Sequence, residues 1–392
     1  MYCLALALSE HLGGLMIVGA AAAFYVASRA AADAVSGPNG APVSATRHAM
    51  AQCIAIACVC AVAVWLDHGE IAIGVLFSTA VGALSLHLGV TIASTPQPRA
   101  PARRSGHGFD VLVDADGHEH VHDQPDDAAE AIPVLPVRGH RAWAMILPAG
   151  VLALMAGFSG KLTLLHGLLF AIQGLLVLMV WDGPRDGAVA DSGRTMSMGR
   201  GVQLALATAL ALVGAMLGVY GAVRMSDETG IMSTGLIASA ALGPLLVLPM
   251  IGSASILASQ GQTQTAVGAS VVIVLINLCC LLPLVILGWH ARQHYFPPLP
   301  APSQAIAAPA TTQSVVDDPT AEVEPLPEEE TPPVLGFPIA VWRIDTVLLI
   351  LLGLMLLPVS LNLWEMRRTE GMLLIVIYAC YLVGSTMLGR RW

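Results

Sequence analysis

Residues 229–291 carry the strongest structural signal in the chain and read TGIMSTGLIASAALGPLLVLPMIGSASILASQGQTQTAVGASVVIVLINLCCLLPLVILGWHA. This stretch contains no Asp, Glu, Lys or Arg. A helix that spans a bilayer needs about 20 predominantly apolar residues, so the stretch is long enough for two such helices. The polar segment 259–265 lies near its middle and is the predicted turn. The stretch therefore predicts a membrane hairpin.

The composition of the whole chain agrees with a membrane protein. Of its 392 residues, 56% are hydrophobic and 11% are charged, whereas a soluble domain carries about 25% charged residues. The basic residues form no patch suited to nucleic acid. Because the sequence also lacks a phosphate-binding glycine loop, a nucleophile elbow and an HExxH pair, we expect neither an enzyme nor a cofactor. The expected partners are the lipid bilayer and a small cation or small solute.

The apolar windows predict an all-α, polytopic membrane protein with ten transmembrane helices. The predicted spans cover residues 11–32, 46–66, 71–94, 142–160, 162–181, 200–223, 230–258, 263–289, 342–364 and 371–389. Of the readily titratable residues, we expect only His87 and His166 to lie well inside a span.

The two halves of the chain follow one plan. The segment that leads to Gly74 parallels the segment that leads to Gly268, and each opens the third span of its half. His166 and Glu370 hold matching places at the start of the two fifth spans. Five spans per half is an odd number, so the second half must be inverted relative to the first. Such inverted repeats are typical of transporters that bind their substrate near the bilayer midplane.

The predicted organisation places a long loop inside each half. The parts are 1–94 (first repeat, helices 1–3), 95–141 (His- and Asp-rich cytoplasmic loop), 142–182 (first repeat, helices 4–5), 183–199 (cytoplasmic linker), 200–289 (second repeat, helices 6–8), 290–341 (Pro- and Glu-rich disordered loop) and 342–392 (second repeat, helices 9–10). The loops and span ends on one side hold about twelve of the 18 basic residues, and the positive-inside rule places that side in the cytoplasm. We therefore expect an integral protein of the cell (inner/plasma) membrane with both termini extracytoplasmic.

The second half contains Leu248-Pro249-Met250, then Ser253, then Ala266-Val-Gly268-Ala269, and then Asn277. In this spacing the chain resembles the cation/Ca²⁺ antiporter superfamily of the sodium/calcium exchanger type. Residues 212–224 and 367–378 look like the sixth and the last helix of that family. The resemblance implies ten helices in two inverted five-helix halves and cation antiport by alternating access.

The chain departs from the family pattern at the ion-binding positions. The family's glutamate falls on Met250 in the second half, and the equivalent stretch Ala55–Cys60 contains no carboxylate. Calcium takes six to eight oxygen ligands, normally with carboxylates among them. We therefore expect that Ca²⁺ exchange is lost or altered.

Six residues are the candidates for an ion or solute pathway. They are Ser78, Thr79, Ser253, Asn277, His87 and Gln52. An intramembrane histidine is a functional candidate, but His87 also fits a neutral imidazole that is bonded to a carbonyl group of the next helix. Gln52 fits either a ligand or a hydrogen-bond partner between helices. The hydroxyl-bearing residues fit either a pathway or ordinary packing and capping.

A histidine-rich loop offers a different function. His118, His120 and His122 alternate along the chain, so an extended strand would place them on one face. Three imidazoles with a carboxylate suit a divalent metal such as zinc, but the segment also fits a solvated acidic loop. The alternative to a transporter is therefore a transport-inactive membrane scaffold or a metal-sensing protein. A polar, water-accessible cavity at Thr79, Ser253 and Asn277 would favour transport.

Overall fold

The fold is described here from a computed structural model of the chain. The structure describes residues 11–35, 44–95, 141–180, 198–230, 232–296 and 334–389, the last range without residues 338, 362 and 365. The first half contains α2 (Leu12–Val35), α3 (Ala45–Trp65), α4 (Gly69–Gly82), the π-helix η2 (Ala83–His87), α5 (Leu88–Ala93), the 3₁₀ helix η3 (Arg141–Met145), α6 (Ile146–Ala156), the 3₁₀ helix η4 (Gly157–Ser159), β1 (Lys161–Leu162) and α7 (Leu164–Val180). The second half contains α8 (Met198–Thr229), α9 (Thr234–Ile237), the π-helix η5 (Ala238–Leu242), α10 (Gly243–Ser259), α11 (Thr263–Ile276), the π-helix η6 (Asn277–Leu281), α12 (Leu282–Tyr295), β2 (Leu335–Gly336), α13 (Ile339–Ser360) and α14 (Arg368–Gly389).

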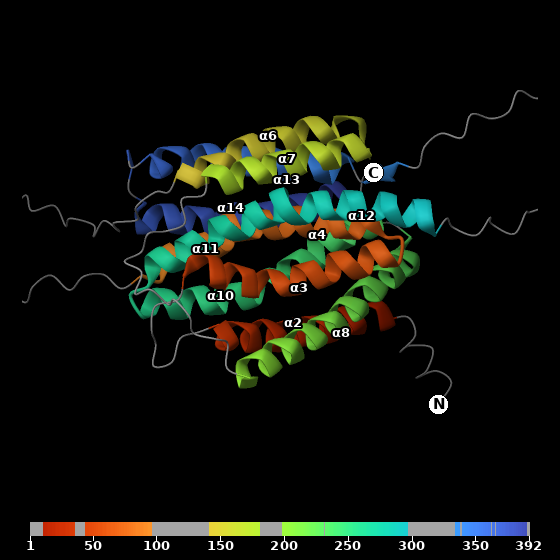
Figure 1. Cartoon of the computed structure of the whole chain (residues 1–392), viewed down its shortest axis with the longest axis horizontal. Helices are drawn as coiled ribbons and strands as arrows, with labels where there is room; N and C mark the ends of the chain where they lie inside the picture. The colour runs from red at the N-terminus through yellow and green to blue at the C-terminus, as the bar shows by residue number, and fades with distance from the viewer. Residues whose placement is uncertain are drawn as a thin grey trace, which may run out of the picture.

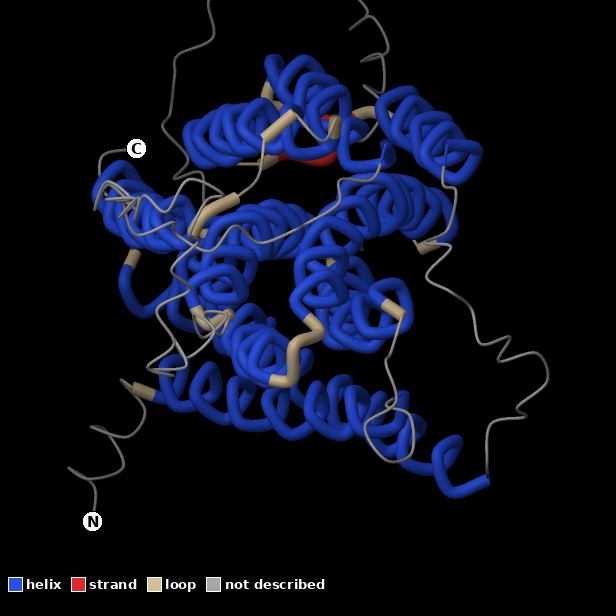
Figure 2. The backbone as a smooth tube through the Cα atoms, turned by 90° about the vertical axis from the view of Figure 1, so that its left-hand side faces the viewer, coloured by secondary structure: helices blue, strands red, loops and turns tan. Residues whose placement is uncertain are grey.

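The helices form one elongated bundle. Figure 1 shows α2 and α8 along one side of it and α6, α7 and α13 along the other, with α3, α4, α10 and α11 between them. Figure 2 looks along the bundle, and most of the helices appear end-on. Among the described residues, eight helices are long and apolar enough to cross a membrane, and two further apolar helices, Trp143–Ala156 and Leu164–Met179, are shorter. The chain is therefore a polytopic helical membrane protein, as predicted, while the number of ten spans stays a prediction.

The predicted hairpin is present at the expected place. Helix α10 ends at Ser259 and α11 begins at Thr263, so the turn falls within the predicted segment 259–265. The continuous helix Thr263–Tyr295 runs on to the end of the charge-free stretch and beyond it. Hydropathy alone does not predict this extension of the helix, because the last residues of α12 are polar and lie beyond the apolar part.

The turn before α4 and the turn before α11 have the same backbone geometry. Asp67 (φ 66°) and Gly261 (φ 78°) both adopt the left-handed conformation. The next residues, His68 (φ −111°, ψ 53°) and Gln262 (φ −90°, ψ 40°), both cap the following helix. Each of these two cap residues donates its amide to the carbonyl group five residues earlier, at 2.8 and 2.9 Å. A residue other than glycine in this conformation is uncommon, so the match between the two turns is specific.

The helices that follow these turns also match. Helices α4 and α11 each have 14 residues, and each continues into a π-helical segment of 5 residues, η2 and η6. This register is the one in which Gly74 pairs with Gly268. The two fifth spans match at their first turns, because Thr163 donates its amide to His166 Nδ1 (3.0 Å) and Arg367 donates its amide to Glu370 Oε2. His166 therefore caps the start of α7.

Small residues allow the closest helix contacts, as is usual between helices in a membrane. A Cβ atom on Gly13 of α2 would lie 2.9 Å from the Met225 amide nitrogen and 3.1 Å from the Gly221 carbonyl oxygen, both in α8. On the other side of the bundle, a Cβ atom on Gly89 of α5 would lie 2.7 Å from the Gly371 carbonyl oxygen of α14. The core is centred on the span Gly69–Ala93, which is the most deeply buried of the eight.

Candidate ion and solute site

Two of the predicted pathway residues meet between the halves. Asn277 Nδ2 donates to Thr79 Oγ1 at 2.9 Å, and both side chains are fully buried. Thr79 in turn donates to the Val75 carbonyl oxygen at 2.7 Å. Asn277 Oδ1 is buried without a hydrogen-bond partner among the described residues. The π-helical segment η6 begins at Asn277, so this amide lies at a local break in the helix pattern, where functional sites are frequent.

A second polar cluster joins α3 to α10. His48 Nε2 and Gln52 Nε2 both lie 3.2 Å from Ser253 Oγ. Ser253 donates to the Met250 carbonyl oxygen at 2.7 Å, so its oxygen accepts from the α3 side chains. Gln52 Oε1 has no hydrogen-bond partner in the described part of the chain. Sequence reasoning missed His48, although its spacing of four residues from Gln52 places both side chains on one face of the helix.

His87 makes the third polar contact between the halves. Its side chain is fully buried in η2, and its Nδ1 bonds to the Ser270 hydroxyl of α11. The Ser270 hydroxyl also lies 3.2 Å from the Ala266 carbonyl oxygen. The partner is thus a hydroxyl group rather than the expected carbonyl. His87 Nε2 is left without a partner among the described residues, and the His48 imidazole lies within electrostatic range of it.

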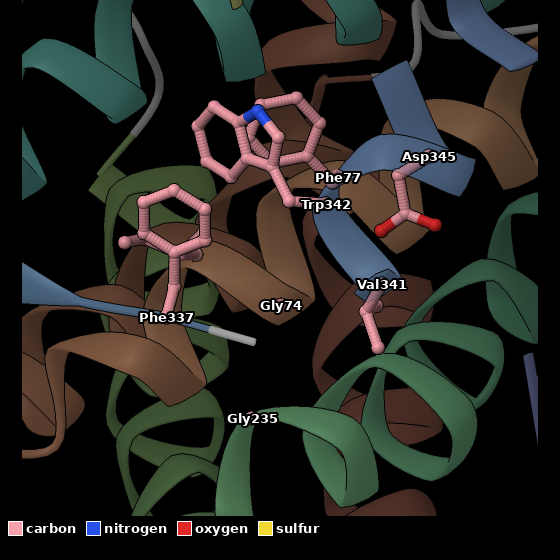
Figure 3. A pocket seen from close by; sticks show the side chains of 8 residues that line it. Gly74, Phe77, Gly235, Phe337, Val341, Trp342 and Asp345 are labelled. Atoms are coloured by element: carbon pink, nitrogen blue, oxygen red, sulfur yellow. The ribbon is translucent and has the colours of Figure 1, made fainter. Parts of the chain in front are cut away.

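Ser78 belongs to a separate cluster. Its hydroxyl donates to the Ser239 carbonyl oxygen at 2.7 Å, and Ser239 Oγ lies 3.2 Å from the Tyr381 hydroxyl. Tyr381 is within electrostatic range of Asp345 in α13, whose side chain is only 1% exposed. Figure 3 shows the Asp345 carboxylate at the wall of a small pocket, together with Trp342, Val341 and Phe77.

Asp345 and His48 are buried ionisable residues that the sequence analysis did not select. A signal for Asp345 was present, because it lies inside the predicted span 342–364, and ionisable residues within spans are rare and functional. It was missed because a position close to the end of a span suggests a solvated interface.

The positions at which the sequence resemblance placed the family's carboxylates are apolar and buried. Met250 is 1% exposed, and Ile56, its counterpart in the register that pairs Gly74 with Gly268, is 0% exposed. Within the described ranges, no group of three or more His, Cys, Asp or Glu side chains is placed to hold a metal ion. His118, His120 and His122 lie outside the described residues.

Charged side chains gather instead at the turn before α4. Asp67 Oδ1 accepts from Trp289 Nε1 (3.1 Å) and forms an ion pair with Arg292 (2.9 Å). His68 Nδ1 lies 3.3 Å from Glu70 Oε1, which also accepts from Thr234 Oγ1 at 2.7 Å. The hydrogen bond to Glu70 raises the pKa of His68 above its ordinary value, against a smaller opposing effect of burial. The turn is therefore a polar cap on one end of the bundle.

The geometry can be compared with solved structures. The crystal structure of the H⁺/Ca²⁺ exchanger CAX matches 98% of this chain and 84% of that chain, with a TM-score of 0.57 and 12% sequence identity. This chain has the cation/Ca²⁺ antiporter fold. A solved structure of the sodium-calcium exchanger NCX_Mj matches 98% of this chain and 99% of that chain, with a TM-score of 0.49 and 14% identity. No protein-family model matches the sequence, and no curated protein sequence matches it. The predicted resemblance is thus confirmed at the level of the fold.

Proposed function

We propose that the chain is a sodium/calcium exchanger-like secondary transporter that works by alternating access and has lost or altered its Ca²⁺ specificity. The observation that carries this proposal is the chemistry at the meeting surface of the two halves. Thr79 and Asn277 hydrogen-bond to each other there, and the glutamate position of the family holds the buried Met250. The proposed site therefore combines the antiporter fold with neutral side chains, and it lacks the negatively charged carboxylate that a divalent ion requires.

The proposed architecture is two inverted five-helix repeats, with ten spans and the domain boundaries predicted above. The similar backbone conformation of the turns at Asp67 and Gly261 supports it, as do the π-helical segments that follow both helices. The contacts between the halves are also reciprocal. Helix α5 of the first half packs on α14 of the second half, and α12 of the second half packs on α7 of the first half. From the distribution of arginines we further propose a cell-membrane location with both termini outside the cytoplasm.

The proposed substrate is a monovalent cation or a small neutral solute. Three uncharged polar atoms that have no hydrogen-bond partner among the described residues could bind it. These atoms are Asn277 Oδ1, Gln52 Oε1 and His87 Nε2. Buried polar atoms without partners are costly, so a bound solute would stabilise the site by supplying the missing contacts. Bringing an uncompensated divalent ion to the same atoms would bury two positive charges without a counter-charge.

The test is a flux screen on the purified protein in lipid vesicles, over Na⁺, K⁺, H⁺ and Ca²⁺. We expect flux of a monovalent ion and no Na⁺-driven radiocalcium uptake above that of empty vesicles. The double variant Thr79→Val with Asn277→Leu should abolish the flux, while Thr208→Val on α8, whose hydroxyl bonds only within its own helix, should leave it unchanged. Robust Ca²⁺ uptake would refute the altered specificity.

A transport-inactive scaffold is the second candidate, because Thr79 and Asn277 are fully buried and bonded to each other. Absence of flux for all four ions would favour it. The metal-sensing alternative rests on His118, His120 and His122. Zinc titration of a peptide that covers residues 105–125 tests it, and no binding at micromolar metal would remove it.

A further inference from the structure

Asp345 is a buried acid with no assigned role in the proposed pathway. It lines a pocket that offers about 10 Å³ to the centre of a water molecule, which is room for about one water. Apart from Asp345, the lining residues are glycines and apolar side chains, with Phe77, Val341 and Trp342 shown in Figure 3. Among the described residues no basic side chain pairs with the carboxylate, and the Tyr381 hydroxyl is its hydrogen-bonding neighbour.

The polar groups that face Asp345 come from three other elements. Tyr381 of α14 lies within hydrogen-bond reach of the carboxylate, and Tyr378 of the same helix lies near it with a hydroxyl that has no hydrogen-bond partner in the described ranges. Ser239 of η5 contacts Tyr381, and Ser78 of α4 bonds to the Ser239 carbonyl. None of these groups carries a positive charge. The described surroundings therefore provide no ion pair for an ionised Asp345.

An ionised carboxylate that is buried without an opposite charge beside it is strongly unfavourable. The charge can be removed by a bound metal cation or by a proton. A metal cation needs several oxygen ligands, but the pocket is lined by hydrocarbon and is about the size of one water. A proton needs only the carboxylate itself, so the geometry favours a proton.

We propose that Asp345 is a proton-binding site, at which the carboxyl group holds one exchangeable proton. On release the O–H bond breaks, the proton passes to a water molecule, and the carboxylate retains the electron pair. Tyr381 and Ser239 connect this site to Ser78, which is the neighbour of Thr79 in the central cluster. Proton binding at Asp345 does not depend on transport, whereas any coupling of proton release to transport rests on the proposed function.

Infrared difference spectroscopy of the full-length protein in lipid vesicles tests the site directly. At neutral pH the wild type should show the carbonyl stretch of a protonated carboxylic acid, and this band should shift in D₂O. Asp345→Asn should abolish the band. Asp227→Asn makes the same change at an exposed aspartate of α8 and should leave the band unchanged. Asp345→Glu keeps a carboxyl group and should move the band, so the assignment survives if Asp345→Asn does not fold.

Several outcomes would overturn the proposal. These are a wild type without the band, a band that persists in folded Asp345→Asn, a band that does not shift in D₂O, and a band that Na⁺ removes at constant pH. The last outcome would assign the site to a metal cation. A band without any flux in the vesicle screen would support the binding site and count only against the proposed transport function.

Discussion

Substitution of Gly74 tests quantitatively how closely α4 packs against its neighbouring helix. A Cβ atom added there would lie 2.6 Å from the Gly235 carbonyl oxygen and 3.3 Å from the Ser239 amide nitrogen. Non-bonded heavy atoms prefer separations of about 3.5–4.0 Å, so α9 would have to move away from α4 by about 1 Å. The obstacle is helix backbone, which cannot rotate aside as a side chain can.

We therefore expect Gly74→Ala to destabilise the protein. Overpacking of a filled core costs about 1–3 kcal/mol, and a clash with backbone belongs in the upper part of that range. A loss of about 2–3 kcal/mol lowers the ratio of folded to unfolded protein about 30- to 150-fold. The same movement would deform the pocket at Asp345, which Gly74 lines.

Helix α11 supplies a matched control for this substitution. Gly268 holds the place of Gly74 in α11, and a Cβ atom there would meet only the Ala45 methyl group, at 3.0 Å. We expect Gly268→Ala to cost less than about 1 kcal/mol. Unfolding of the purified proteins by SDS in mixed micelles, followed by tryptophan fluorescence, measures both values. Equal costs for the two variants, or a cost near zero for Gly74→Ala, would refute the packing argument.

Two further predictions concern the turns at the ends of the bundle. Because the folded-state pKa of His68 is raised by Glu70, the pair contributes its full stability below the ordinary histidine pKa of about 6.5 and loses it as the pH rises through the raised value. The melting temperature of the wild type in detergent should therefore fall more between pH 6 and pH 8 than that of Glu70→Gln, and parallel pH profiles would contradict this. Gly261→Ala should cost about 1 kcal/mol, because its φ of 78° strains an L-residue although the space around it is open. Gly252→Ala is the control, since it is also unobstructed but lies within α10, and a loss of stability no larger than in that control would count against the strain.

The positions of the helices were predictable because hydropathy is a local property and the bilayer favours helices of a limited range of lengths. The hairpin turn between Ser259 and Thr263 fell inside the predicted segment. The pairing of Gly74 with Gly268 was visible for the same reason, since both turns repeat a short sequence pattern. The π-helical segments were not predicted, because they depend on packing with distant parts of the chain.

The partners of the polar side chains could not be predicted in this way. Thr79, Ser253 and Asn277 were candidates for one shared cavity, but Asn277 bonds to Thr79, whereas the side chains that bond to Ser253 come from α3. Ser78 and Thr79 are neighbours in the chain, yet they bond in different clusters because successive side chains of a helix point in different directions.

The amino-acid sequence by itself determined that the chain is a membrane protein and where its helices lie, and it predicted that carboxylates are missing from the positions where exchangers of the resembled family bind ions. Those properties follow from residue type and spacing along the chain. Only the tertiary structure decided that Asp345 is buried, because its burial depends on the packing of α13 against α4. It likewise decided which hydroxyl, amide and imidazole groups meet, since these contacts join residues that lie far apart in the sequence.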